Sequence, residues 1–437
     1  MSAIDTAPPS FSESPVKAIA PPRDWLGELV LLIPILGCTF IEKFAVPMGS
    51  QSISFGLPAI GGAVGVGLLF GRMRFIPTNL MYFCMLMAVF TAMQIFGGNP
   101  FSWQSLALLA VMHAPYATGL KVGTARPDIQ LKFFQTVMVI IAACGIAQFG
   151  LQFVVSHKLA YPLDSLGTKW VVQNFNEEIP LSPGGSSYKS NGVFLAEPSE
   201  FSQDLAIAVI IELLLYRRIL FLMLFFGGMV VAYSGSGIVI LGCLLPPIII
   251  KYRRPELFFV IVIGALVAYF GADALDLQLF VKRASEFSSP DSSGFGRYVG
   301  GWYLFGQFLL QNGATALFGL GAGAIKPYAL IALYPVSPVT WVKIPFEYGI
   351  GGAVLYFAFV GYCMFKPKQL GLFKLAMLVH LLINTPLVPF VQGLNFSMLV
   401  WPPPEEDKTG AANIRRARRL AVPFTRPKLA LGAEPPP

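Results

Sequence analysis

The sequence predicts an all-α, polytopic integral membrane bundle of about twelve transmembrane helices with two large outer loops. Hydrophobic residues make up 55% of the chain and charged residues only 12%, about half the charged share of an ordinary soluble domain. Apolar runs long enough to cross a bilayer recur along most of the sequence. Lys and Arg gather in short turns between those runs. Lipid is therefore the expected solvent for most of the chain.

Apolar runs of roughly the 20 residues that a span requires predict the individual spans. These runs lie at 26–46, 51–70, 75–97, 101–120, 133–155, 201–216, 256–274 and 346–365. Two longer stretches predict helical hairpins, because basic residues flank both of their ends. They are 219–250, turning at Tyr233–Gly237, and 370–401, turning at Asn384–Pro389.

The membrane domain is expected to cover residues 25–401, with a tail on each side. Residues 1–24 are rich in Pro, Ser and Ala, without periodicity, and predict a disordered cytoplasmic tail. Residues 402–437 predict a basic cytoplasmic tail. No cleavage site follows the first apolar run, so that run is expected to be retained as an anchor.

The distribution of positive charge predicts the orientation, since basic turns stay on the cytoplasmic side. The basic turns carry Arg72 and Arg74; Lys121, Arg126 and Lys132; Arg217 and Arg218; Lys251, Arg253 and Arg254; and Lys366, Lys368 and Lys374. The turns at 97–100, 233–237 and 384–389 hold no Lys or Arg. Both termini are then cytoplasmic, and loops 156–200 and 275–345, with short interfacial helices, lie outside. Topology accounts for the net charge of +8, so no nucleic-acid partner is expected.

The first outer loop runs into a span through Glu197 and Pro198. Proline disfavours helix at the residue before it, so a helix should begin at or just after Pro198. Ser199 would lie in its first turn, where free N–H groups form an anion site. Glu197 would then serve as a general base for a hydroxyl. The alternative is a capping and topology role for Glu197, Glu200 and Asp204.

The second outer loop supplies cations that suit phosphate oxygens. They are Lys282, Arg283, Arg297, Lys326 and Lys343. Arg297 is followed by Tyr298 and Trp302, which predicts an amphipathic helix at the membrane interface. Arg297 is therefore a candidate ligand for a lipid-linked phosphate. The alternative is an ordinary interfacial arginine that extends towards water.

Other chemistry finds little support in the motifs. The glycine run Phe318–Lys326 lacks the Gly-Lys-Ser/Thr ending of a nucleotide loop and predicts a packing turn. The histidines and cysteines show no ligand spacing, so neither metal nor cofactor is expected. Ionisable groups within spans are few, mainly two histidines and Glu212, which is expected to pair with Arg217. This scarcity argues against a transporter.

The order of the motifs resembles the O-antigen polymerase/O-antigen ligase superfamily. The matching segments are Gly192–Ser199, Tyr233–Gly237, Gly296–Trp302, Phe318–Gly323 and Glu347–Gly352. The resemblance implies a membrane glycosyltransferase that takes an undecaprenyl-diphosphate-linked glycan as donor, without metal or nucleotide. It also implies the bacterial inner membrane, and a flippase and a chain-length regulator of the same pathway as partners. Many relatives have arginine at the positions of Lys189 and Gly237. Ligases have a histidine where this chain has Thr340–Lys343, which disfavours the ligase.

The resulting hypothesis is a repeat-unit polymerase of exopolysaccharide or O-antigen. Arg297, with Lys189 and Lys343, would hold the donor diphosphate, and Glu197 would activate the acceptor hydroxyl. The remaining substrate-binding candidates are Ser199, Tyr298, Trp302, Lys326 and Glu347. The alternatives are an O-antigen ligase, a lipid-linked oligosaccharide flippase or other transporter, and a non-catalytic scaffold. The hypothesis requires the two outer loops to touch.

Overall fold

The computed structural model is mostly helical, and four of its helices are long and apolar enough to cross a membrane. These are α3 (Pro77–Phe96), α5 (Ile129–Val154), α9 (Gly235–Tyr252) and α16 (Thr340–Phe365). The structure describes residues 24–48, 51–163, 170–172, 178–181, 184–252, 288–290, 292–366 and 371–402. The predicted span 256–274 and the predicted tails, apart from the border residues 24 and 402, lie outside them. A helical membrane protein is consistent with these features, and the number of spans stays a prediction.

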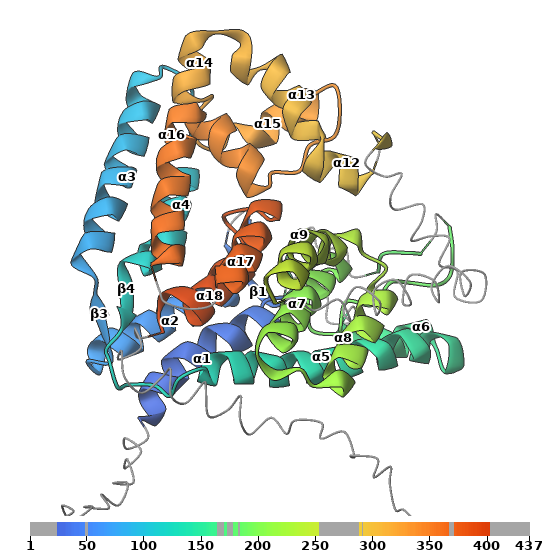
Figure 1. Cartoon of the computed structure of the whole chain (residues 1–437). Helices are drawn as coiled ribbons and strands as arrows, with labels where there is room; N and C mark the ends of the chain where they lie inside the picture. Colours follow the sequence, from blue (N-terminus) through green and yellow to red (C-terminus); the bar gives the residue numbers. More distant parts are fainter. Residues whose placement is uncertain are drawn as a thin grey trace, which may run out of the picture.

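The long helices do not share one direction. In Figure 1, α3 and α16 rise side by side at one edge of the molecule, whereas α5 runs across its base. Shorter apolar helices accompany them: α1 (Trp25–Thr39), α2 (Gly56–Leu69), α8 (Ile219–Ala232) and α17 (Gly371–Ile383). The predicted runs therefore become helices of unequal length and tilt.

The predicted span 101–120 is not one helix. It consists of α4 (Trp103–His113), a 3₁₀ turn (Ala114–Ala117) and strand β4 (Thr118–Leu120). Pro115 lacks the N–H that would continue the helical hydrogen bonds. β4 instead pairs antiparallel with β3 (Met73–Phe75), which precedes α3. A separate β-hairpin joins β1 (Ala45–Met48) to β2 (Gln51–Ser54).

The chain turns at both of the predicted positions. α8 ends at Ala232 and α9 begins at Gly235, so the chain turns within Tyr233–Gly237. α17 is followed by α18 (Pro389–Asn395) and a π-helical turn (Phe396–Val400), with the turn at Asn384–Pro389. The helix after the first long loop, α7 (Pro198–Ile211), begins at Pro198 as predicted and continues into a π-helical turn (Glu212–Tyr216).

The long loops carry short helices. The first contains α6 (His157–Ala160). The second contains α12 (Ser293–Tyr298), α13 (Gly300–Gln307), a 3₁₀ turn (Leu309–Gln311), α14 (Gly313–Phe318) and α15 (Ile325–Ile331). Figure 1 shows α12 to α15 gathered beside the first half of α16. Together with the start of α16 they bury a second, smaller apolar core, which includes Leu304, Val342 and Phe346.

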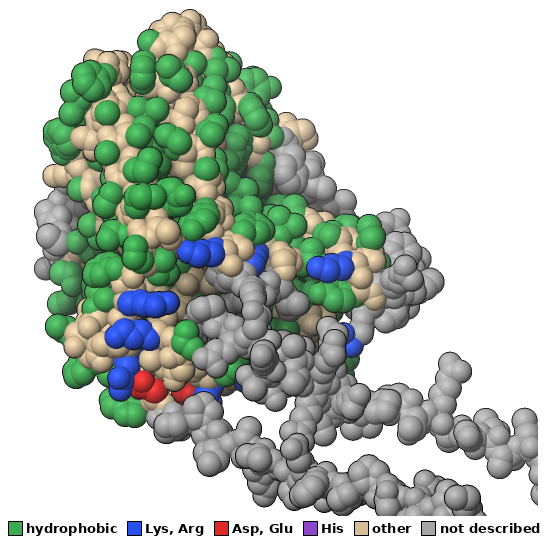
Figure 2. Space-filling model, turned by 60° about the vertical axis from the view of Figure 1, so that its left-hand side comes forward, with side chains coloured by type: hydrophobic (Ala, Val, Ile, Leu, Met, Phe, Trp, Pro, Cys, Tyr) green, Lys and Arg blue, Asp and Glu red, His purple; other side chains and the backbone are tan. Residues whose placement is uncertain are grey.

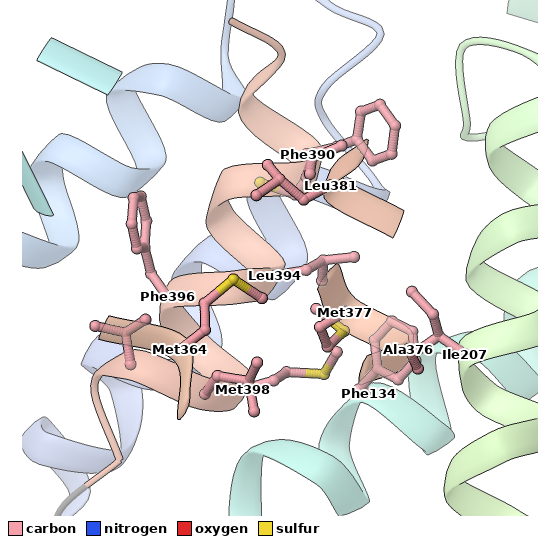
Figure 3. Packing of buried hydrophobic residues seen from close by; sticks show 14 of the residues in the cluster. Phe134, Ile207, Met364, Ala376, Met377, Leu381, Phe390, Leu394, Phe396 and Met398 are labelled. Carbon is pink, nitrogen blue, oxygen red and sulfur yellow. The ribbon is translucent and has the colours of Figure 1, made fainter. Parts of the chain in front are cut away.

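α7 lies at the centre of the main apolar core. Its residues from Glu200 to Ile211 are all buried. Figure 3 shows Phe134 of α5 and Ile207 of α7 beside Met377 of α17. Polar side chains on α7 therefore face other parts of the protein. Because they are buried there, they need hydrogen-bond or charge partners within the protein.

Residues from three of the basic turns, Arg72, Lys121 and Lys366, lie near the β3–β4 pair and the start of α3. The β3–β4 pairing joins the Lys121 N–H to the Arg72 carbonyl at 2.9 Å, and Lys366 Nζ donates to Thr78 Oγ1 at 3.3 Å. In Figure 2, Lys and Arg lie over the lower part of the molecule, and the upper part is mainly hydrophobic. The turns without Lys or Arg meet the long loops, as Asn99 does through its bond to the Gly319 carbonyl at 2.9 Å. The sidedness of these turns and the cytoplasmic end stay predictions.

α16 is broken at Gly349, and the glycine run fills the break. Gly349 has a left-handed φ of 69°. The carbonyls freed by the break accept from the glycine run: Leu320 N–H to Phe346 O at 2.9 Å and Gly321 N–H to Glu347 O at 3.2 Å. The run is therefore a packing turn against a helix, as predicted. Non-helical backbone is tolerated inside the protein here, because neighbouring segments satisfy its polar groups.

We expect Gly349→Ala to lower the free energy of unfolding by about 2 kcal/mol or more. A Cβ there would lie 2.0 Å from the Leu317 carbonyl oxygen, and alanine resists the left-handed backbone. The midpoint of thermal unfolding in detergent measures the effect. Gly361→Ala in the same helix is the matched control, since nothing lies within 4 Å of its Cβ position, and it should be neutral or slightly stabilising. Equal midpoints for the two variants would contradict the interpretation of the break.

Candidate functional site

The two long loops meet at the start of α7. Glu197 precedes the helix, and its Oε2 accepts a hydrogen bond from Ser199 Oγ at 2.7 Å. Arg297 of α12 reaches the same place, with Nη2 3.5 Å from Glu197 Oε2 and 3.4 Å from Ser199 Oγ. The Arg297 and Glu197 side chains remain 23% and 27% exposed. The three groups therefore form a partly open acid–hydroxyl–guanidinium cluster, from residues about a hundred positions apart.

The turn between α8 and α9, which contains Ser234 and Ser236, contacts the first turn of α7 next to this cluster. Ser236 Oγ donates to the Ser199 carbonyl at 3.3 Å, and Ser202 Oγ donates to the Ser234 carbonyl at 3.2 Å. A Cβ at Gly237 would lie 2.2 Å from the Ser202 carbonyl oxygen. No side chain fits at Gly237 without moving α9 from α7. The glycine at this position therefore permits the close contact that holds Ser199 in place.

Arg297 is positioned by the segment that leads into α16. Its carbonyl accepts from Trp341 Nε1 at 3.2 Å, and the Ser337 N–H donates to the Gly296 carbonyl at 2.9 Å. The indole of Trp302, on α13, lies 5.3 Å from that of Trp341 and is mostly exposed. The Arg297 backbone is thus held by Trp341, and Trp302, which lies beside Trp341, has an exposed ring.

Tyr298 lies on the inner side of the same helix. It packs against the main core, and this burial raises the pKa of its phenol, while the neighbouring Arg297 charge opposes the rise. The phenol is therefore neutral near pH 7, whereas Trp302 points outward. Tyr298 is therefore packed against the core and Trp302 is exposed, although they are only four residues apart in the sequence.

Lys343 and Glu347 form their own ion pair inside α16. They are spaced i,i+4, and their side chains are 7% and 0% exposed. The Lys343 charge is therefore engaged by Glu347 in this conformation. The Glu347 carbonyl belongs to the break at Gly349, so this pair sits where the glycine run docks.

Two further lysine candidates lie apart from this pair. Lys326 is exposed on α15. Lys189 is largely buried, and its backbone is held by the Ile179 carbonyl at 2.9 Å and by the Tyr161 hydroxyl at 2.8 Å. Of the sequence candidates, Glu197, Ser199 and Arg297 come into direct contact.

A second polar cluster on α7 was not anticipated as such. Glu200 does cap the helix, since its Oε2 accepts from the Ala196 N–H at 3.2 Å. Asp204 has no rim position. It is fully buried, with Oδ1 4.0 Å from Nε2 of the equally buried His380. The available signal was spacing, because Glu197, Glu200 and Asp204 recur at i, i+3 and i+7, on one helical face.

Glu212 pairs with Arg218 rather than with the predicted Arg217. Arg218 Nε lies 3.1 Å from Glu212 Oε1, and the Arg218 N–H also donates to the carboxylate. Arg217 adopts a left-handed φ of 62° and ends the helix. The chain reverses at Arg217, and this reversal brings Arg218 back to the Glu212 carboxylate.

The cluster at the start of α7 combines three chemical capacities. Glu197 can accept a proton from a hydroxyl. The Arg297 fork and the free N–H groups of a helix N-terminus suit an anion. Within the part of the chain that the structure describes, no group of three or more His, Cys, Asp or Glu side chains is arranged to hold a metal ion.

Neither a protein-family model nor a curated protein matches this chain. The motifs and the contacts among Glu197, Ser199 and Arg297 are therefore what indicate a function.

Proposed function

We propose that the protein polymerises undecaprenyl-diphosphate-linked oligosaccharide repeat units at the outer face of the bacterial inner membrane. The observation that carries the proposal is the contact of Glu197 and Ser199 with Arg297. These residues come from two motifs that resemble the O-antigen polymerase/ligase superfamily. A base, a hydroxyl and a phosphate-binding cation meeting at a helix N-terminus are what glycosyl transfer from a diphosphate requires.

Arg297 and the start of α7 would bind the diphosphate of the donor. The distance of 3.5 Å between Arg297 Nη2 and Glu197 Oε2 is long for a charge-assisted hydrogen bond. The guanidinium can therefore turn towards phosphate oxygens without losing a strong bond. As the anomeric C–O bond breaks, the leaving diphosphate gains charge, which the fork and the helix N–H groups stabilise.

Glu197 would act on the acceptor sugar. Its carboxylate takes the proton of the attacking hydroxyl as the new glycosidic C–O bond forms. The bond between the anomeric carbon and the phosphate oxygen breaks, and its electron pair leaves with undecaprenyl diphosphate. Ser199 holds the carboxylate through its 2.7 Å hydrogen bond, and Trp302 offers an exposed face for a sugar ring.

The experiment that tests the proposal supplies purified protein in detergent with lipid-linked repeat units. Long glycan chains and free undecaprenyl diphosphate are expected. In cells, deletion of the protein should cause single lipid-linked repeats to accumulate. Accumulation of full-length lipid-linked chains would instead favour the ligase, and would overturn the polymerase.

A transporter is the second candidate, because the structure buries ionisable groups whose burial together the sequence does not predict. Glu200, Asp204 and His380 lie within the helical core, where proton-coupled transporters keep such groups. The detergent assay separates the two candidates, since transport has no meaning without a sealed membrane. Polymer formed in detergent supports the enzyme. Substrate movement across proteoliposomes without polymer supports the transporter.

A further inference from the structure

We propose that Glu42, Asp204 and His380 form a buried proton-binding site, connected to Glu197 by the acidic face of α7. Glu42 lies between α1 and β1 and is 2% exposed, whereas Asp204 on α7 and His380 on α17 are fully buried. Three separate segments thus bring ionisable side chains to one place in the core. The site is distinct from the Glu197–Arg297 cluster and stands whether the chain polymerises or transports.

The polar atoms of this site lack protein partners. Both carboxylate oxygens of Asp204, both ring nitrogens of His380 and Oε2 of Glu42 are buried without a hydrogen bond among the described residues. His380 Nε2 and Asp204 Oδ1 are 4.0 Å apart, beyond hydrogen-bond length but within reach of a small side-chain rotation. Buried polar atoms rarely stay unpaired. A proton shared between Asp204 Oδ1 and His380 Nε2 would give both of these atoms a hydrogen bond.

The charges of the site lead to the same conclusion. Glu42 is close enough to Glu200 and Asp204 for their charges to repel one another. Arg297 pairs with Glu197, and Lys43 donates to the Val193 carbonyl at 3.0 Å. Three buried carboxylates outnumber the one buried ammonium beside them, Lys43, so they cannot all be ionised, since each uncompensated charge costs several kcal/mol. Protons must therefore reside in the cluster.

Apart from the buried Lys43, the named groups around the site are neutral. Cys38 of α1 and a backbone N–H of Phe390 from α18 adjoin Glu42. Asn384 Nδ2 donates to Gln203 Oε1 at 2.6 Å and to the His380 carbonyl at 2.7 Å. On the α9 side, α7 meets Gly237 and Ser236. This shell fixes the site in the core without adding charge.

A path joins the site to the surface. Glu200 and Asp204 lie on one face of α7, and Glu197 directly precedes the helix. The Glu197 side chain is partly exposed, whereas Glu200 and Asp204 are 4% and 0% exposed. A proton taken up by the Glu197 carboxylate can pass to the Glu200 carboxylate and then to Asp204 and Glu42. Each transfer breaks one O–H bond and forms another, with no redox partner. This last link, from substrate hydroxyl to core, rests on the proposed function.

Infrared spectroscopy of the full-length protein in detergent at neutral pH tests the site directly. A protonated-carboxyl C=O band that shifts in heavy water is expected, and Asp204→Asn should remove part of it. Glu212→Gln is the matched control, because Glu212 is equally buried but paired with Arg218, and it should leave the band unchanged. A wild-type protein without the band overturns the proposal. Full band intensity in both Asp204→Asn and Glu42→Gln does the same.

A second measurement uses only the wild-type protein, so it survives a variant that fails to fold. Dicyclohexylcarbodiimide adds the O–H of a protonated carboxyl in apolar surroundings across its C=N bond, with no leaving group. Mass spectrometry should then find the adduct on Asp204 or Glu42. Modification confined to other carboxyls, or none at all, argues against a proton site there.

The link to catalysis has its own readout. In the polymerisation assay, Asp204→Asn should lower kcat by roughly 10-fold or more with KM unchanged, and should change the pH dependence of kcat. Loss of the infrared band with an unchanged pH profile removes the relay and keeps the proton site. A wild-type protein without polymerase activity refutes the proposed function, and the infrared result still decides the site.

Discussion

Arg297→Ala should reduce kcat for polymerisation by about 10²- to 10³-fold. The guanidinium lies at the start of α7 with Glu197 and Ser199, 3.5 and 3.4 Å away, and we place the leaving diphosphate there. Its loss removes stabilisation of charge that develops in the transition state, so kcat falls more than KM rises. Glu197→Gln should have a comparable effect, because the amide cannot accept the proton.

The measurement is polymer length and rate at matched protein levels. Arg297→Lys is the informative companion, since it keeps the charge and loses the bidentate fork, and should retain intermediate activity. Lys158→Ala removes an exposed cation from α6 and serves as the control with unchanged activity. Normal long-chain polymer in both Arg297→Ala and Glu197→Gln would refute these residue roles.

Lys343→Met should lower the free energy of unfolding by about 3–5 kcal/mol, because it leaves the Glu347 carboxylate buried and uncompensated. The pair is almost inaccessible, at 7% and 0% exposure, and lies where α16 breaks and the glycine run docks. Lys343→Met combined with Glu347→Leu should recover most of the loss, since no charge then remains buried. The midpoint of thermal unfolding in detergent measures both.

The double variant also separates structure from binding. If it folds and polymerises with an unchanged KM for the lipid-linked donor, Lys343 has a structural role only. A raised KM in a stable double variant supports the predicted contact with the diphosphate. A single variant as stable as the wild type would show that Glu347 escapes burial or takes up a proton.

Local signals predicted several elements well. Pro198 marked the start of α7, because proline fits the first helical position and disfavours helix before it. The serine-glycine turn and the Asn384–Pro389 turn were found by asking where basic flanks require the chain to return. The glycine run was recognised as a packing turn, because its residues permit close backbone approach.

Other predictions failed where tertiary contacts outweigh a local pattern. The run 101–120 is apolar throughout, yet the segment after His113 leaves the helix to pair as a strand with Met73–Phe75. Glu212 was assigned to Arg217 by helical spacing, and the left-handed turn at Arg217 gives it Arg218 instead. Asp204 was interpreted as a capping residue, although it lies two turns inside a helix that protein covers on all sides.

The sequence by itself determined the helical class and the chemistry available, and it predicts lipid as the surroundings of the helices. Those follow from composition, apolar run length and residue type, which are properties of short segments. Only the tertiary structure decided which of those groups meet. Arg297 pairs with Glu197, which lies about a hundred residues earlier in the chain, and Lys343 pairs with Glu347. Asp204 lies 4.0 Å from His380. Burial and partnership depend on how helices pack around one another, and no local pattern contains that information.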